Sequence, residues 1–160
     1  MKKITLVILS ILFCGMAFAK HKHKKKQQAS GNIISVSIRH TACYGRCPNY
    51  TIEINKDGSV IYTGTRFVPD TGIFKKNIGI EKAMGIINQF NTYRVDTCKD
   101  IYRSRIADLP GLVVTVKYND STKMIRDANS GPDYLKQLAD TIDDIGKKTD
   151  NGWTKIGVLK

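Results

Sequence analysis

Apolar and polar residues alternate in two stretches near the start of the chain, which is the pattern of half-buried β-strands. Residues 34–38 alternate between aliphatic and polar side chains and predict a strand that begins near Asn32. Residues 50–54 alternate in the same way, and residues 60–65 form a returning strand. The Asp57-Gly58 pair between them predicts a tight hairpin in which both turn residues have positive φ.

Two later stretches show the helical period instead. Residues 80–92 repeat apolar side chains every three or four positions and predict an amphipathic helix. The last helix is predicted to end at Gly146, and Ser130 with Asp133 three positions later indicates a capping box at its start. The buried stripe of this last helix is expected to contain Leu135, Leu138, Ile142 and Ile145.

A second hairpin separates the two helices. Residues 112–118 and 122–126 are its expected strands, and residues 119–121 are its turn. Residues 66–79 and 93–111 show no clear period, and we interpret them as irregular connections.

The order of these elements predicts an α+β fold. The chain has a strand and then two hairpin–helix units, which we expect to build one antiparallel sheet with the helices on one face. This single domain is predicted to cover residues 32–155, and residues 156–160 are a C-terminal tail. Trp153, close to that tail, is a candidate to fold back onto the core.

The N-terminus has the three parts of a secretory signal peptide. Lys2 and Lys3 precede an apolar run, and Ala17-Phe18-Ala19 forms a cleavage motif. We therefore predict that residues 1–19 are a signal peptide cleaved after Ala19. The apolar run has about 15 residues, whereas a membrane-spanning helix needs about 20. We expect a protein exported to the periplasm or the extracellular space, with no transmembrane anchor after cleavage.

Basic residues follow the cleavage site directly. Residues 20–31 are polar and lysine-rich, and we expect a disordered basic arm. Loss of Lys2 and Lys3 would lower the formal charge from +12 to +10, and about half of this remainder lies in the arm. Anionic envelope components or another envelope protein are therefore the expected partners, and no reading motif for nucleic acid is visible.

Cleavage would leave an odd number of cysteines: Cys43, Cys47 and Cys98. Export permits disulfides, and we predict a Cys43–Cys47 bridge that stabilises the fold by about 2 kcal/mol. Gly45 would let this short loop turn tightly, and Pro48 would stiffen its exit. A Cys47–Cys98 bridge would close a longer loop and is the alternative pairing.

The same loop allows other chemistry. Cys43 and Cys47 could exchange disulfides, although redox pairs usually have two intervening residues and precede a helix. Together with His40 they could supply three metal ligands, one fewer than a structural zinc site needs. His40 could also act as a base for Cys43, but no orienting acid is visible, so we interpret it as an incidental loop histidine. No metal or cofactor is expected.

A motif around the cysteines has the form Cys-x-Gly-x-Cys-Pro-x-Tyr, and an Asp-x-Pro element precedes the second hairpin. The residues in these positions are Cys43, Gly45, Cys47, Pro48, Tyr50, Asp108 and Pro110, and Trp153 matches a C-terminal tryptophan. Over about residues 33–155 the chain resembles a bacterial family known as domain of unknown function 6438. The resemblance implies an exported or envelope protein and carries no catalytic residues across.

Further acidic and phenolic side chains lie in the long irregular connection. They are Asp96, Asp100, Asp108 and Tyr102, and we expect the acids to be solvated. No phosphate-binding loop, serine elbow or zinc-protease motif is present. The sequence therefore predicts a non-catalytic binding or structural module of the cell envelope. A thiol-disulfide redox or metal-binding protein that uses the cysteine loop is the alternative.

Overall fold

A computed structural model of the protein describes residues 32–106, 109–147 and 152–159, which form eight strands and two α-helices. In chain order the elements are β1 (Ile33–His40), β2 (Asn49–Asn55), β3 (Ser59–Arg66), β4 (Gly72–Asn77), α2 (Ile80–Thr92), the 3-10 turn η1 (Val95–Thr97), β5 (Ile101–Tyr102), β6 (Leu112–Tyr118), β7 (Thr122–Asp127), α3 (Asp133–Gly146) and β8 (Thr154–Gly157). The predicted signal peptide 1–19 with its cleavage site Ala19, the basic arm 20–31 and Asp108 lie outside the described residues.

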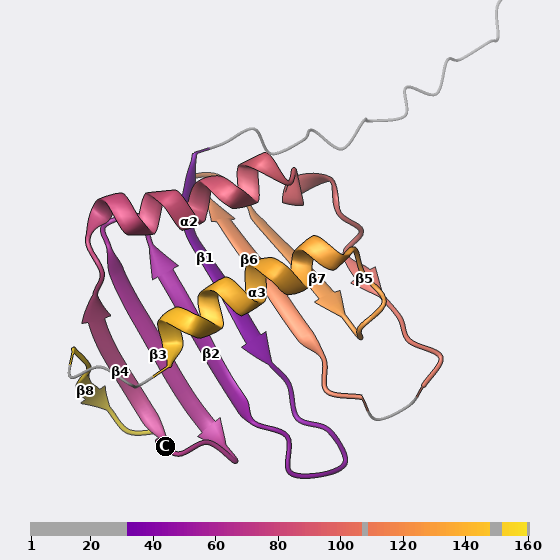
Figure 1. The fold of residues 1–160 in the computed structure, drawn as a ribbon, viewed down its shortest axis with the longest axis horizontal. Coiled ribbons are helices and arrows are strands. Elements are labelled where there is room, and N and C mark those ends of the chain that lie inside the picture. Colours follow the sequence, from indigo (N-terminus) through magenta and orange to yellow (C-terminus); the bar gives the residue numbers. More distant parts are fainter. Residues whose placement is uncertain (1–31, 107–108, 148–151, 160) are drawn as a thin grey trace, which may run out of the picture.

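The strands form one sheet in the order β5-β7-β6-β1-β2-β3-β4-β8 (Figure 1). All neighbours are antiparallel except β5 and β7, which run parallel. The predicted α+β class with a mostly antiparallel sheet is therefore confirmed. In the described part of the chain no helix is long and apolar enough to cross a lipid bilayer.

Strand β1 lies at the centre of the sheet because it pairs with both β2 and β6. Val36 faces Ile54 on one side and Val116 on the other, and all three side chains are completely buried. Alternation then places the intervening residues, such as Ser37, on the opposite face of the sheet. The period of two that predicted β1 is thus the direct consequence of having one face in the core.

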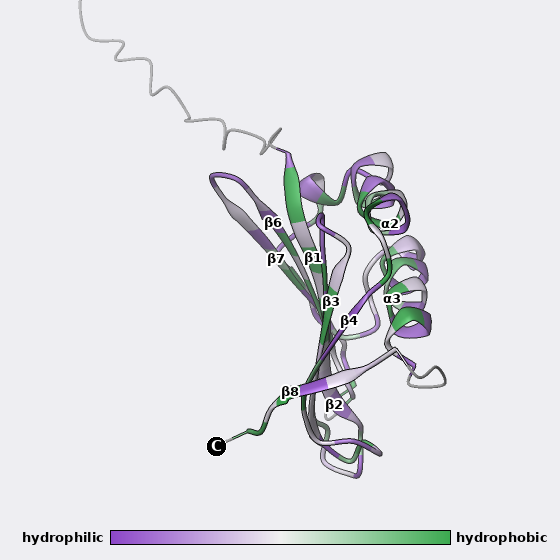
Figure 2. Ribbon diagram, turned by 90° about the vertical axis from the view of Figure 1, so that its left-hand side faces the viewer, coloured by the Kyte–Doolittle hydropathy of each residue, from purple (hydrophilic) through white to green (hydrophobic). Residues whose placement is uncertain are grey.

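Helices α2 and α3 lie on the same side of the sheet in Figure 2. The α2 side chains that enter the core are Ala83, Ile86, Ile87 and Phe90. The corresponding α3 side chains are Leu135, Leu138, Ala139 and Ile142. Burial of these aliphatic and aromatic groups is the main stabilisation of the fold, at about 1.5–3 kcal/mol for each large side chain.

The start of α3 differs from the capping-box prediction. Its N-cap is Pro132, without a side-chain capping bond, so the assignment of Ser130 as the cap is wrong. The Asp127 carboxylate explains the difference, because its Oδ1 accepts hydrogen bonds from the backbone N–H groups of Ser130 (2.9 Å) and Gly131 (2.8 Å). A loop closed by Asp127 therefore leads into the helix.

The first hairpin is confirmed, but its turn is different from the expected one. Gly58 has a positive φ of 87°, whereas Asp57 does not. The Asp57 side chain instead accepts hydrogen bonds from the backbone N–H (2.9 Å) and the hydroxyl (2.7 Å) of Ser59. This Asx-type capture replaces the second positive φ.

Three strands lie in segments that were interpreted as irregular or as the C-terminal tail: β4, β5 and β8. The sequence of β4 does not show the alternation of apolar and polar residues, because Lys76 occupies a position that faces the core. Its ammonium lies 4.5 Å from the centre of the Trp153 ring, so the lysine stem is buried while its charge contacts an aromatic face. Strand β8 pairs with β4 and extends to Gly157, so Trp153 does fold back onto the core.

Candidate functional site

The cysteine loop connects β1 to β2 at one end of the sheet. Cys43 and Cys47 form a disulfide whose Cα atoms are 5.7 Å apart. Cys98 is a free, buried thiol, and its sulfur lies 3.0 Å from the Tyr134 hydroxyl. The alternative Cys47–Cys98 pairing is therefore wrong, because the packing of α3 against the η1 region holds Cys98 away from the loop.

The cysteine loop does not need a glycine at position 45 in order to turn tightly. It has no positive φ, and a Cβ built on it would meet only the Cys43 sulfur, at an ordinary 3.8 Å. Its backbone N–H donates a hydrogen bond to the same sulfur at 3.2 Å. Tyr44 projects almost entirely into solvent, with 93% of its surface exposed. The loop is thus closed by its disulfide and not by a strained glycine.

Next to this loop, three side chains from distant parts of the chain meet. His40 at the end of β1 and Tyr50 in β2 are cross-strand partners, and their rings stack at 4.7 Å. Asp143 on α3 bridges them, because one of its oxygens contacts His40 Nε2 at 2.8 Å and the other accepts the Tyr50 hydroxyl hydrogen at 2.9 Å. The carboxylate thereby connects the helix to both strands.

The environment makes these phenols weak acids. Burial raises the pKa of Tyr50 well above its usual value, and the hydrogen bond to Asp143 and its negative charge add to this. Burial also raises the pKa of Tyr62, with further contributions from the charges of Asp70 and Asp143. Both side chains are therefore neutral at physiological pH.

A pocket of about 440 Å³ opens beside this cluster. Its lining comes from the exit of the cysteine loop, β2, β3, the β3–β4 connection and the end of α3; the residues include Pro48, Tyr50, Ile52, Tyr62, Phe67, Asp70, Asp143 and Gly146. This volume lies within the usual range for small-molecule sites. Two residues of the predicted motif, Pro48 and Tyr50, thus line the same pocket.

Phe67 at this pocket has an unusual backbone conformation. Its φ is +55°, which a bulky side chain rarely adopts and which costs of order 1–3 kcal/mol. The ring is flanked by two guanidinium groups, with Arg66 at 5.0 Å and Arg46 of the cysteine loop at 5.8 Å from its centre. These cation–π contacts connect the disulfide loop to the β3–β4 connection. Such strain is common where a side chain is held ready to contact a ligand.

Trp153 packs against Tyr62, which lines the pocket. The two rings form an edge-to-face contact with centres 6.0 Å apart, and Tyr62 also stacks on Tyr50 at 5.7 Å. An aromatic row therefore runs from His40 through Tyr50 and Tyr62 to Trp153. As the chain contains a single tryptophan, its fluorescence reports on this row.

Pro110, the described residue of the later motif element, lies near the start of the cysteine loop. Thr41 and Gly111 exchange hydrogen bonds: the Thr41 hydroxyl donates to the Gly111 carbonyl at 3.1 Å and accepts from its N–H at 3.0 Å. This places Pro110, directly before Gly111, at the same end of the sheet as the disulfide. The Pro110 carbonyl accepts a hydrogen bond from Asn129 at 3.4 Å.

Sequence reasoning missed Asp143, and the placement of His40 in the loop is wrong, because His40 is the last residue of β1 and contacts Asp143. The two residues are 103 positions apart, so no local pattern links them. Asp143 lies on α3 one position after the buried Ile142, where an acid is expected to be solvated. The only available signal was that His40 ends a strand whose alternation directs it toward the helices.

Other candidate chemistry is not supported by the geometry. Cys43 is in a disulfide, so it offers no nucleophile to His40, and neither loop sulfur is a free thiolate for a metal. Among the described residues no group of three or more His, Cys, Asp or Glu side chains is arranged around a common point. Asp96 pairs with Arg94 at 3.0 Å and Asp100 with Lys123 at 2.6 Å, so both acids are ion-paired.

The fold and the site define a small α+β domain with a disulfide loop and an aromatic pocket at one end of its sheet. The model of a family described as domain of unknown function 6438 matches residues 34–146, and the chain belongs to this family. The matched region runs from β1 to the end of α3 and contains His40, Tyr50 and Asp143. Comparisons with curated proteins and with solved structures found no match.

Proposed function

We propose that the protein is an exported, non-catalytic binding module whose ligand enters the pocket beside the cysteine loop. The pattern of residues 1–19 supports export, and the Cys43–Cys47 disulfide agrees with an oxidising compartment. The disulfide acts as a staple that holds Pro48 and Tyr50 in place. The observation that carries the proposal is the pocket itself, because chain segments about 100 residues apart supply its walls.

The pocket favours a ligand with an aromatic or aliphatic body and a cationic end. Tyr50, Tyr62 and Phe67 supply aromatic surface, on which a flat apolar group can stack. Asp70 and Asp143 place two carboxylates at the same cavity. Lys147 also lines the pocket, but its ammonium pairs with Asp144. A positive group bound near the carboxylates would therefore be stabilised.

The cluster is better suited to binding than to catalysis. The one side-chain hydrogen bond of His40 within the described part of the chain goes to Asp143. The hydroxyl of Tyr50, which shares Asp143 with His40, is a poor nucleophile because its raised pKa keeps it protonated. A His–Asp pair without a nucleophile or an oxyanion site lacks the parts of a hydrolytic centre.

A titration followed by Trp153 fluorescence tests the pocket. The probes are phenethylammonium and phenylpropionate, which have similar bodies and opposite charges. We expect the cation to bind more tightly, and Phe67→Ala to weaken it because an exposed wall of the pocket is lost. Tyr44→Ala is the matched control, since Tyr44 is an exposed aromatic residue that does not line the pocket. Equal binding of both probes, or equal effects of both variants, would contradict the proposal.

Export is tested separately by N-terminal sequencing of the protein recovered from culture. The proposal predicts a mature chain that begins at Lys20, directly after Ala19. A full-length chain in the cytosolic fraction would contradict this part of the proposal without affecting the pocket.

A thiol-disulfide redox function is a second candidate, favoured by one observation: Cys43 and Cys47 are only half-buried and so can be reached by a thiol. Alkylation and intact-mass analysis after equilibration with a glutathione redox buffer separates the two functions. A staple stays oxidised in this buffer, whereas a redox-active pair is reduced and takes up alkylating reagent.

A further inference from the structure

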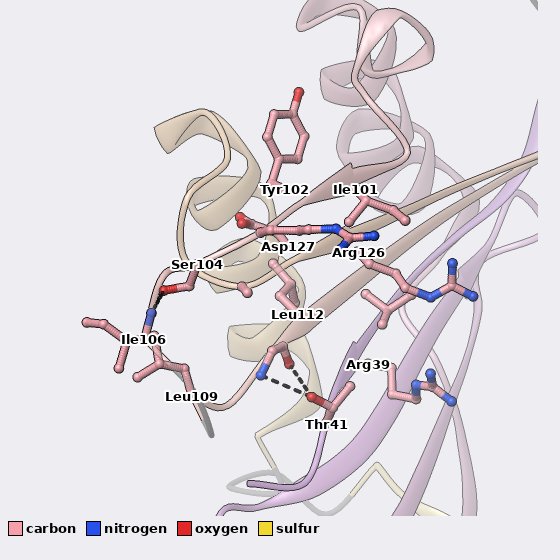
Figure 3. Close-up of a pocket in the computed structure, with 14 residues that line it drawn as sticks. Arg39, Thr41, Ile101, Tyr102, Ser104, Ile106, Leu109, Leu112, Arg126 and Asp127 are labelled. Atoms are coloured by element: carbon pink, nitrogen blue, oxygen red, sulfur yellow. Dashed lines mark hydrogen bonds between the residues drawn. The ribbon is translucent and has the colours of Figure 1, made fainter.

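A second pocket, of about 630 Å³, lies at the other side of the cysteine loop, where β1, β6 and β7 meet the segment that follows β5. Three arginines line it: Arg39 from β1, Arg103 after β5, and Arg126 from β7. Figure 3 shows the labelled Arg39 and Arg126 extending in the same direction from the sheet. None of the residues that line the aromatic pocket takes part in this one.

The strand register explains why Arg39 and Arg126 converge. Val113 in β6 pairs with Arg39 on one side and with Arg126 on the other, so the three residues form a row across the sheet. Each arginine follows a buried residue, Ile38 or Ile125, and alternation therefore places both on the face opposite the helices. Two strand spacings separate their Cα atoms, about 10 Å. Long side chains at this separation can reach one ligand between them.

These arginines lack the acidic partners that other basic side chains have. Within the described part of the chain, Arg94, Lys117 and Lys123 each pair with a carboxylate at 3.0 Å or less. By contrast, no ion pair or side-chain hydrogen bond involves Arg39, Arg103 or Arg126 among those residues. Three guanidiniums with no carboxylate partner among the described residues therefore surround one cavity and give it a positive potential.

The only described lining residue with a carboxylate does not neutralise them. Asp127 is buried, and its Oδ1 accepts two backbone N–H groups from the loop before α3. It follows Arg126 in β7 and therefore points to the other face of the sheet. Its charge is held by these amides and is directed away from Arg39 and Arg126, as Figure 3 shows.

Part of the remaining wall of the pocket is apolar. Ile101 is 44% exposed and Ile106 is 68% exposed, although both are large hydrophobic side chains. Leu112 and Val113 add further aliphatic surface. An apolar wall that faces a group of guanidiniums is complementary to a molecule with a hydrophobic body and an anionic end.

We infer that this arginine pocket is a binding site for a small organic anion, with a carboxylate held by Arg39 and Arg126 and an apolar body against Ile101 and Ile106. Arginine suits this role because its planar fork can donate two parallel hydrogen bonds to one carboxylate. The site shares no lining residue with the aromatic pocket, so this inference does not depend on the proposed function.

Backbone amide NMR of the folded protein tests this site with phenylbutyrate as the probe. We expect phenylbutyrate to shift the amide signals of Ile101, Val113 and Arg126, and phenylbutylammonium to leave them in place. Arg39→Gln and Arg126→Gln should each weaken binding at least about tenfold, since each removes a charged hydrogen bond. High salt should weaken the binding further by screening.

Matched controls keep the test decisive. Lys75→Gln removes one positive charge from the same face of the sheet, outside the pocket, and should leave the affinity unchanged. Both arginines are exposed, so the spectra of their variants should show an intact fold. The inference is overturned if phenylbutylammonium binds equally well, if the Arg39→Gln, Arg126→Gln double variant binds as the parent does, or if inorganic phosphate alone binds as tightly as phenylbutyrate.

Discussion

Gly146, the last residue of α3, allows the helix to lie very close to β2. A Cβ built on Gly146 would lie 2.2 Å from Ile52 Cδ1 and 2.9 Å from its Cγ1. Carbon atoms in contact are normally 3.5–4.0 Å apart, so the substitution Gly146→Ala requires a displacement of about 1.5 Å. Ile52 is only 1% exposed, and its Cγ1 as well as its Cδ1 lies within 3.0 Å of the added Cβ, so rotation of the terminal methyl group alone does not remove the clash.

Overpacking of this kind costs about 1–3 kcal/mol of the free energy of unfolding. Gly85 in α2 is the matched control, because a Cβ there meets no atom within 4 Å. Gly85→Ala should therefore stabilise the protein by up to about 1 kcal/mol through helix propensity alone. The same chemical change in two helices is thus expected to have opposite signs.

Urea unfolding followed by Trp153 fluorescence measures both values. Ile52→Val removes the Cδ1 atom and should cost about 0.5–1.5 kcal/mol in the parent. In the Gly146→Ala background it should cost less or even restore stability, with a coupling energy of about 1 kcal/mol or more. If Gly146→Ala stabilises the protein as Gly85→Ala does, or if the two changes at positions 146 and 52 are additive, the close approach of α3 to β2 is refuted.

Three further predictions concern the disulfide and two titrating groups. The Cys43→Ser, Cys47→Ser double variant should lose about 2 kcal/mol by the chain-entropy relation for a five-residue loop, measured by urea unfolding; a loss near zero would show that the loop is no staple. The hydrogen bond from Arg94 lowers the pKa of Asp96, so its contribution is present above the unfolded value near 4 and is lost as the pH falls further. Asp96→Asn should therefore flatten the acid limb of a stability–pH profile, and an unchanged limb would contradict this. Burial and Asp143 raise the pKa of Tyr50, so stability should fall as the pH rises above about 10, and Tyr50→Phe should reduce this alkaline loss in the same profile.

The aromatic pocket shows how a partly correct motif can conceal a site. The sequence motif contained Pro48 and Tyr50, and the structure places both at the pocket. The motif gave no reason to include Asp143 or Phe67. Asp143 reaches the pocket only because α3 packs against the sheet, and Phe67 lies in a connection that has no clear period in the sequence. Gly45 attracted attention through its place in the motif, whereas Gly64 and Gly146 are among the positions where a Cβ would clash.

Strand β4 illustrates a different limit. Its pattern fails the alternation test because Lys76 occupies an inward position, where its ammonium lies over the Trp153 ring. One of the two partner strands of β4, β8, and the Trp153 ring over Lys76 both come from a segment about 80 residues later. Alternation reports on burial, and burial by such a distant segment cannot be read from the residues of the strand.

By itself the sequence determined the elements whose signal is local. The helix predicted over residues 80–92 has these same bounds in α2, and the alternating runs became β1 and β2, because a period of 3.6 or 2 directly reflects which side of an element faces the core. Only the tertiary structure decided that His40 meets Asp143, that Arg39 and Arg126 flank Val113, and that Cys98 stays unpaired. These contacts depend on strand register and helix docking, which the whole core sets together and which no short segment encodes.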